Sequence, residues 1–209
     1  MGLLCVTPTI LGILHARVFG ESGPMSPVVS HDVIPIIILN WNGFEDTQQC
    51  VEHALAQTGV SYRIWVIDNG SDGDDFANLQ ALFGSHPLVT VTRNESNLGF
   101  TGGMNAAMES ILSDPDDCPE YLALLNNDAF VSNIWLYELH QKALDGAGAV
   151  ASSMRCFSDP NLMDNAGHVW LNTGEVLPRG ARELADRFDQ ENQPRSGSRR
   201  GSTSVFYCQ

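Results

Sequence analysis

Asp68 and Asn69 follow the apolar run Tyr62–Ile67 and lead into the turn-forming sequence Gly-Ser-Asp-Gly. A carboxylate at the end of a strand can accept a hydrogen bond from a base or a ribose, as acidic residues do in nucleotide-binding folds. The alternative is an Asx-turn, in which the same carboxylate closes the turn and contacts no ligand. The residues alone leave both interpretations open.

A second polar group follows the apolar run Val33–Leu39, where Asn40 and Asn42 flank Trp41 ahead of Gly43. This group adds an aromatic side chain to the polar residues that end the strands. Taken alone, it is typical of a turn that ends a strand, with Trp41 packed on the edge of the sheet.

Glycines precede a predicted helix in the segment Asn97–Asn105, which contains Gly99, Gly102 and Gly103. A backbone without side chains can approach a ligand closely, and the N-terminus of a helix offers unpaired N–H groups to an anion. The spacing matches neither GxGxxG nor the GxxxxGK[ST] phosphate loop. A turn that leads into the helix is an equally good interpretation.

Asn126, Asn127 and Asp128 follow another apolar run, Leu122–Leu125. Asp128 could be the N-cap of a helix predicted near Val131–Leu144. The alternative is a ligand for a hard divalent cation, since Mg²⁺ and similar ions are often held by one or two carboxylates together with substrate phosphates.

The elements that must position these residues alternate between strands and helices. Apolar, β-branched runs predict strands buried on both faces, and apolar residues three and four positions apart predict helices. Four βα units with short links indicate an α/β fold, an open, mostly parallel sheet with helices on both faces. In such sheets ligands bind outside the carboxyl ends of the strands, where these polar groups lie. The predicted strands are 33–39, 62–67, 88–92, 121–125 and 147–152, and the predicted helices are 47–57, 76–83, 102–112 and 134–144.

The composition fits one globular domain and argues against some partners. The chain has 209 residues, 43% of them hydrophobic, and a formal net charge of −14. This charge repels phosphate backbones, so nucleic acid is not expected as a partner. The five cysteines lie far apart without a CxxC pair, which favours a reducing cytoplasm. No stretch approaches the ~18 continuous apolar residues that would span a bilayer.

The two ends of the chain differ from the middle. Residues 1–30 lack the charged start of a signal peptide and are expected to form an N-terminal extension outside the fold. After Phe157 the alternation stops, and turn-forming residues surround a hairpin predicted over Val169–Leu177. Pro194–Ser204 is a loop rich in Ser, Gly and Arg, and Val205–Cys208 resembles the beginning of a strand.

Taken together and in this order, the four groups resemble the motifs of family 2 glycosyltransferases, GT-A-fold enzymes that use nucleotide-diphosphate sugars. The rhamnosyltransferase-like branch of polysaccharide assembly is the most similar. The resemblance covers about residues 33–209 and implies a Rossmann-like GT-A sheet that is incomplete at the C-terminus. The matching blocks are Ile36–Gly43, Val66–Gly73, Asn97–Asn105 and Leu124–Ala129.

The resemblance implies a role for each group. The Leu39 backbone and Trp41 would lie beside the nucleobase, Asp68 and Asn69 would read its edge, and Asn126–Asp128 takes the place of the metal-binding DxD motif. Asn126 replaces the first carboxylate of that motif, so metal affinity should depend on the bound diphosphate. Met104 stands where this branch often has Asn. The implied nucleotide-sugar ligands are Leu39, Trp41, Asp68, Asn69, Gly99, Gly102, Asn105 and Asn127, and the implied ligand of Mn²⁺ or Mg²⁺ is Asp128.

The implied reaction is inverting transfer of a sugar, with dTDP-rhamnose as a candidate donor, to a saccharide or lipid-linked glycan acceptor. The family places its catalytic Asp or Glu after a further strand and loop, so the general base is expected beyond Gln209. One domain is expected over 31–209, with the donor-binding half over 31–157 and part of the acceptor side over 158–209. The expected location is the cytoplasm, with peripheral contact at the inner face of the membrane as an option.

Two other functions stay open at this point. The chain could be a nucleotide-sugar binding module without catalytic activity, or another α/β nucleotide enzyme such as a nucleotidyltransferase. Transfer of a sugar from a donor, as opposed to release of pyrophosphate from a nucleoside triphosphate, would separate the enzymes.

Overall fold

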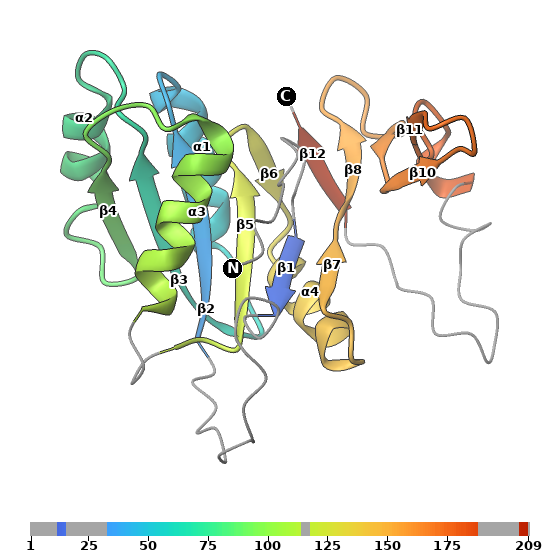
Figure 1. Cartoon of the computed structure of the whole chain (residues 1–209), viewed down its shortest axis with the longest axis horizontal. Helices are drawn as coiled ribbons and strands as arrows, with labels where there is room; N and C mark the ends of the chain where they lie inside the picture. Colours follow the sequence, from blue (N-terminus) through green and yellow to red (C-terminus); the bar gives the residue numbers. More distant parts are fainter. Residues whose placement is uncertain (1–11, 16–32, 114–117, 188–204, 209) are drawn as a thin grey trace.

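The computed structural model describes residues 12–15, 33–113, 118–187 and 205–208 (Figure 1). Its largest sheet has six strands in the order β4-β3-β2-β5-β1-β7, and the four strands from β4 to β5 run parallel. The strands of this sheet are β1 (Gly12–His15), β2 (Val33–Asn40), β3 (Ser61–Asp68), β4 (Val89–Arg93), β5 (Tyr121–Asn126) and β7 (Ala149–Ala151). The predicted open, mostly parallel α/β sheet is therefore confirmed.

Helices cover both faces of this sheet, as central strands with consecutive buried residues require. Ile34, Ile36 and Ile38 of β2 face one core cluster, whereas Ile37 and Leu39 face the other. The first cluster includes residues of α1, α2 and α4, and the second includes residues of α3, which lies in front of the strands in Figure 1. The helices are α1 (Phe44–Leu55), α2 (Asp75–Phe83), α3 (Gly99–Leu112) and α4 (Trp135–Leu144).

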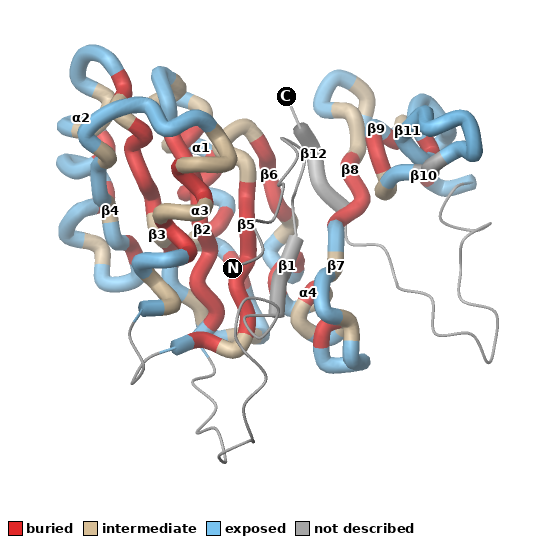
Figure 2. Tube along the Cα trace, in the orientation of Figure 1, coloured by how far each residue is buried: buried red, intermediate tan, exposed pale blue. Residues whose placement is uncertain are grey.

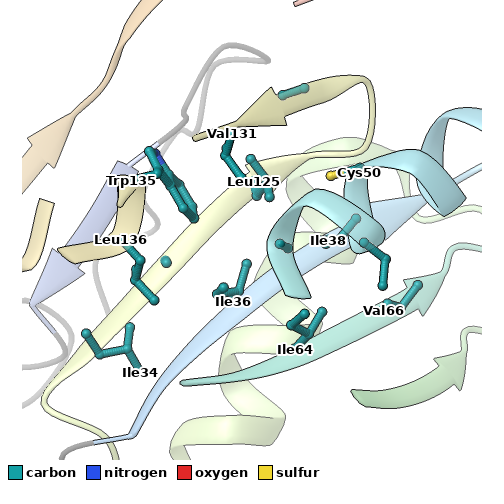
Figure 3. Packing of buried hydrophobic residues seen from close by; sticks show 14 of the residues in the cluster. Ile34, Ile36, Ile38, Cys50, Ile64, Val66, Leu125, Val131, Trp135 and Leu136 are labelled. Atoms are coloured by element: carbon teal, nitrogen blue, oxygen red, sulfur yellow. The ribbon is translucent and has the colours of Figure 1, made fainter. Parts of the chain in front are cut away.

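The larger cluster fixes α1 and α4 against β2 and β5 (Figure 3). Trp135 of α4 is fully buried and donates its indole N–H to the Ser152 hydroxyl at 3.0 Å. β2 and β5 are buried along nearly their whole length in Figure 2. A strand buried on both faces has apolar residues at consecutive positions, which is the pattern that predicted these strands.

A second sheet of four strands follows the order β6-β12-β8-β9, and β10 pairs with β11 as the predicted hairpin. β12 lies between β6 and β8, so this short C-terminal strand is paired on both sides. The bounds are β6 (Ala129–Val131), β8 (Ser153–Cys156), β9 (Met163–Asn165), β10 (His168–Trp170), β11 (Val176–Pro178) and β12 (Val205–Cys208).

The prediction that residues 1–30 stay outside the fold is wrong for Gly12–His15. These residues form β1, which pairs antiparallel with β5 on one side and with β7 on the other. The pairing gives both neighbours backbone hydrogen-bond partners that they would otherwise lack. Residues 1–11 and 16–30 lie outside the described part of the chain, as does the predicted loop over Pro194–Ser204. Among the described helices, none is long and apolar enough to cross a membrane.

Candidate functional site

The polar residues predicted to bind a ligand meet at the carboxyl edge of the parallel strands. In the register of β2 and β3, Asn40 pairs with Asp68, and in that of β2 and β5, Leu39 pairs with Asn126. Because the three strands are parallel neighbours, the residues that follow them emerge side by side. The structure thereby brings together three of the four motifs through backbone pairing alone.

Asp68 is fully buried, and both of its carboxylate oxygens contact protein groups. Oδ1 accepts a hydrogen bond from Asn40 Nδ2 at 2.9 Å, and Oδ2 accepts one from the Ser71 backbone N–H at 3.2 Å. The second bond closes the turn after β3, as the Asx-turn interpretation expected. In this arrangement Asp68 contributes to the edge of the site by holding Asn40 and the Ser71 backbone in position.

Arg93, the last residue of β4, is the cation beside this buried carboxylate. Its Nε lies 3.4 Å from Asp68 Oδ2, and its Nη2 donates to the Ser71 carbonyl at 2.8 Å. The guanidinium also lies over the Phe76 ring, 5.6 Å from its centre. Sequence reasoning missed Arg93, since a strand-ending arginine has no distinctive local signal. Its contacts offset the cost of burying the Asp68 charge.

Asn69 is almost fully buried and joins the turn after β3 to the glycine segment before α3. Its Nδ2 donates to Asn97 Oδ1 at 3.0 Å and to the Gly99 carbonyl at 3.2 Å. Its Oδ1 accepts from Asn94 Nδ2 at 2.9 Å and from the Leu98 N–H at 3.3 Å. The glycine segment is thus tied to the Asp68–Asn69 turn by a single amide side chain.

The glycines of this segment have different local requirements. α3 begins at Gly99, which has a φ of 68°, three residues earlier than predicted. A Cβ at Gly103 would come within 2.9 Å of Leu39 and 3.0 Å of Asn69 Oδ1, so the helix needs glycine there to approach β2. Gly102 and Asn105 lie on the first turns of α3, both half-buried, and the hydrogen bonds described above do not include them.

Trp41 is 54% exposed, so it is not packed on the sheet edge as the structural alternative supposed. The adjacent Asn42 holds the loop in place, although its φ of 51° is unusual for a residue with a side chain. Its backbone N–H donates to Ser71 Oγ at 2.9 Å, and its Oδ1 accepts from the Asp72 N–H at 2.8 Å. These bonds hold the loop that carries Trp41 beside the turn that follows Asp68 and Asn69.

Asn127 is linked to Asp68 through two further side chains. Asn127 Nδ2 donates to Thr47 Oγ1 at 3.0 Å, and Thr47 Oγ1 donates to Asn40 Oδ1 at 2.7 Å. Asn40 then donates to Asp68. Sequence reasoning missed Thr47, which is fully buried on α1. A polar residue on the otherwise apolar face of a predicted helix was the available signal.

Asp128 lies in the turn between β5 and β6 and is half-buried. It caps no helix, because α4 begins only at Trp135 with Ile134 as its N-cap residue. The N-cap interpretation is therefore wrong. Burial, and then the negative charge of Asp128, raise the pKa of the Cys50 thiol above its usual range. The protonated thiol donates to the Asn126 carbonyl at 3.2 Å and supports the strand that leads to Asp128.

The residues around Asp128 fit a metal ion that is shared with a ligand. Within the described ranges, no group of three or more His, Cys, Asp or Glu side chains could hold a metal ion by itself. A half-exposed carboxylate supplies one hard oxygen ligand, and Mg²⁺ and similar ions bind readily through one carboxylate and substrate phosphates. The donor set therefore fits a cation that arrives with a diphosphate.

The family model for glycosyl transferase family 2 matches residues 36–201 of the chain. No curated protein matches it. Two similar solved structures are TarS 1-349 from S. aureus in complex with UDP, and the mannosyltransferase PcManGT from Pyrobaculum calidifontis in complex with GDP-Man and Mn²⁺.

TarS 1-349 is 13% identical with a TM-score of 0.45, and the match covers 59% of this chain and 34% of TarS 1-349. PcManGT is 14% identical with a TM-score of 0.45, and the match covers 62% of this chain and 36% of PcManGT. The chain thus spans about a third of the length of each. The family model, in contrast, covers most of the chain, and on this ground the chain belongs to glycosyl transferase family 2.

Proposed function

We propose that the chain binds the nucleoside-diphosphate part of a sugar donor at the carboxyl edge of the sheet, as the donor-binding part of a glycosyltransferase. The observation that supports this most directly is the meeting of the Asp68–Asn69 turn, the Asn97–Gly99 segment and the Asn126–Asp128 segment at one edge. Family membership supplies the class of ligand that such an edge would take.

Within this proposal the base lies beside the Leu39 backbone and the exposed ring of Trp41. Asn69 and the Asp68 turn shape the edge that the base meets. The sugar and diphosphate lie along the start of α3, where the N–H groups of the first turn can stabilise an anion. The residues assigned to this part are Gly99, Gly102, Asn105 and Asn127.

Asp128 would hold a divalent cation, Mn²⁺ or Mg²⁺, together with the diphosphate. When bound, the cation supplies positive charge against the negative charge that develops on the leaving diphosphate. The cation also matters for binding, because an anionic donor must enter a protein with a formal net charge of −14. Asp128 orients this positive charge at the end of β5.

The reaction we propose is inverting transfer of the sugar to a saccharide or lipid-linked glycan acceptor, with dTDP-rhamnose as a candidate donor. An acceptor hydroxyl, deprotonated by a general base, attacks the anomeric carbon as the nucleoside diphosphate leaves. We assign the base to none of the described carboxylates. The family resemblance predicts it in an acidic motif that follows a further strand and loop.

Asp128→Ala tests the proposal. Isothermal titration calorimetry with UDP and dTDP, with and without Mn²⁺, should show Mn²⁺-dependent binding for the unaltered chain. The variant should lose at least about tenfold in affinity in Mn²⁺, or about 1.4 kcal/mol, because the only carboxylate of this segment is gone.

Asp145→Ala is the matched control, since the Asp145 side chain is 68% exposed beyond the end of α4. This variant should bind both nucleotides like the unaltered chain. If a chain that circular dichroism shows to be folded binds neither nucleotide under any metal condition, the proposed donor site is wrong.

A further inference from the structure

One face of α1 supports the segment that precedes Asp128. Gly43, Thr47 and Cys50 are spaced four and three residues apart, which places them on one side of the helix. A Cβ at Gly43 would come within 2.9 Å of Asn127 Nδ2. Thr47 Oγ1 accepts from Asn127 Nδ2 at 3.0 Å, and the Cys50 thiol donates to the Asn126 carbonyl at 3.2 Å.

The same helix face reaches the end of β2 through Thr47. A hydroxyl has one donor and can also accept, and Thr47 uses both capacities. It accepts from Asn127 and donates to Asn40 Oδ1 at 2.7 Å. Thr47 and Asn40 are both fully buried, so the bond between them is shielded from water.

The hydrogen bonds that link Asn127 to Asp68 form a series in which every donor points toward Asp68. Asn127 donates to Thr47, Thr47 donates to Asn40, and Asn40 donates to the Asp68 carboxylate at 2.9 Å. Hydrogen bonds in series polarise one another, especially away from water. Positive charge placed at the Asn127 end would therefore strengthen the donors that lead to the carboxylate at the other end.

We propose that Thr47 is a positioning residue that couples the cation end of the donor site, Asn127 and Asp128, to its base end, Asp68 and Asn69. This inference rests on the proposed function. It adds that a divalent cation and the base of a nucleoside diphosphate favour each other's binding through the Thr47 hydroxyl, in addition to any contact between the cation and the diphosphate. Such coupling is reciprocal, so either ligand can report it.

Thr47→Val tests the inference, because valine keeps the shape of threonine and removes the hydroxyl. The measured quantity is the ratio of the UDP or dTDP dissociation constants without and with Mn²⁺, obtained by calorimetry. We expect this ratio to fall about fivefold, the equivalent of one net hydrogen bond. Affinity in the absence of Mn²⁺ should change less than about twofold, because Thr47 contacts no part of the proposed ligand.

Thr47→Ser keeps the hydroxyl and should restore the ratio, whereas Thr90→Val removes an exposed hydroxyl on β4 and should leave it unchanged. If Thr47→Val does not fold, Thr47→Ala removes the same hydroxyl with a residue that favours the helix. The inference is overturned if the ratio for Thr47→Val does not change, whether binding is unaffected or is weakened equally with and without Mn²⁺. Failure of the proposed function looks different, since the unaltered chain would then bind no nucleotide.

Discussion

Arg93→Met should lower the free energy of unfolding by about 2–4 kcal/mol, a large effect for a residue on an edge strand. Removing one partner of a buried ion pair typically costs about 3–5 kcal/mol, because the other charge stays buried without its counterion. The Arg93 side chain is 39% exposed, so solvent screens part of the attraction and the expected cost is lower than for a fully buried pair. Methionine keeps an unbranched side chain but also removes the guanidinium that lies over the Phe76 ring. Urea denaturation followed by tryptophan fluorescence measures the change.

A double-mutant cycle identifies the cause of this loss. If Arg93 acts by compensating the Asp68 charge, Asp68→Asn with Arg93→Met should be less destabilised than the sum of the single variants, by about 1–2 kcal/mol. Arg63→Met is the matched control, since Arg63 is exposed on β3, and it should change stability by no more than about 0.5 kcal/mol. Additive effects in the cycle would show that the pair makes no specific contribution.

Gly70→Ala should destabilise the protein by a similar amount, about 2–4 kcal/mol, for a steric reason. Gly70 has a φ of 72°, a conformation that costs other residues about 1 kcal/mol or more. In addition, a Cβ at this position would come within 2.5 Å of the Ser96 carbonyl carbon and 2.7 Å of the Asn97 nitrogen. These are backbone atoms, so the turn after β3 and the segment before α3 would have to move apart.

Gly73→Ala separates the two causes within the same turn. Gly73 has a φ of 69°, but a Cβ there would meet nothing within 4 Å. Gly73→Ala should therefore lower the free energy of unfolding only by the conformational cost of a positive φ, about 1 kcal/mol. Equal losses of stability in the two variants, measured by chemical denaturation, would mean that the contact between Gly70 and Ser96 has no importance. Nucleotide binding should weaken in Gly70→Ala, because Asn69 joins these same two segments.

The central strands could be predicted because their burial is visible in the sequence. β2 and β5 are buried on both faces, so their apolar residues form continuous runs. β1 could not be recognised from its four residues, whereas Val205–Cys208 resembles the beginning of a strand and forms β12. Neither strand could be placed in its sheet, because each gains its place from distant partners. Gly12 pairs with Leu124, and Phe206 pairs with Val131. Such non-local pairing leaves no local pattern.

In the candidate site, too, some residues could be predicted from local sequence patterns and others depend on non-local packing. Asn40, Asp68 and Asn126 could be assigned to one edge because each ends a strand that the sequence reveals. The contacts of Thr47 and Arg93 depend on the packing of α1 and the register of β4, which no single-sequence pattern specifies. For this reason the sequence indicated which residues meet, but not which ones hold them in position.

The order of strands in the main sheet has a consequence for how the site forms during folding. Ile36 pairs with Ile64, 28 residues away, and Ile64 with Val89, 25 residues away, so β2, β3 and β4 can assemble through connections that each contain one helix. Ile36 also pairs with Ala123, 87 residues away, and contacts of such separation form more slowly. During synthesis the turn that carries Asp68 and Asn69 can therefore fold first, and Asp128 arrives later with β5.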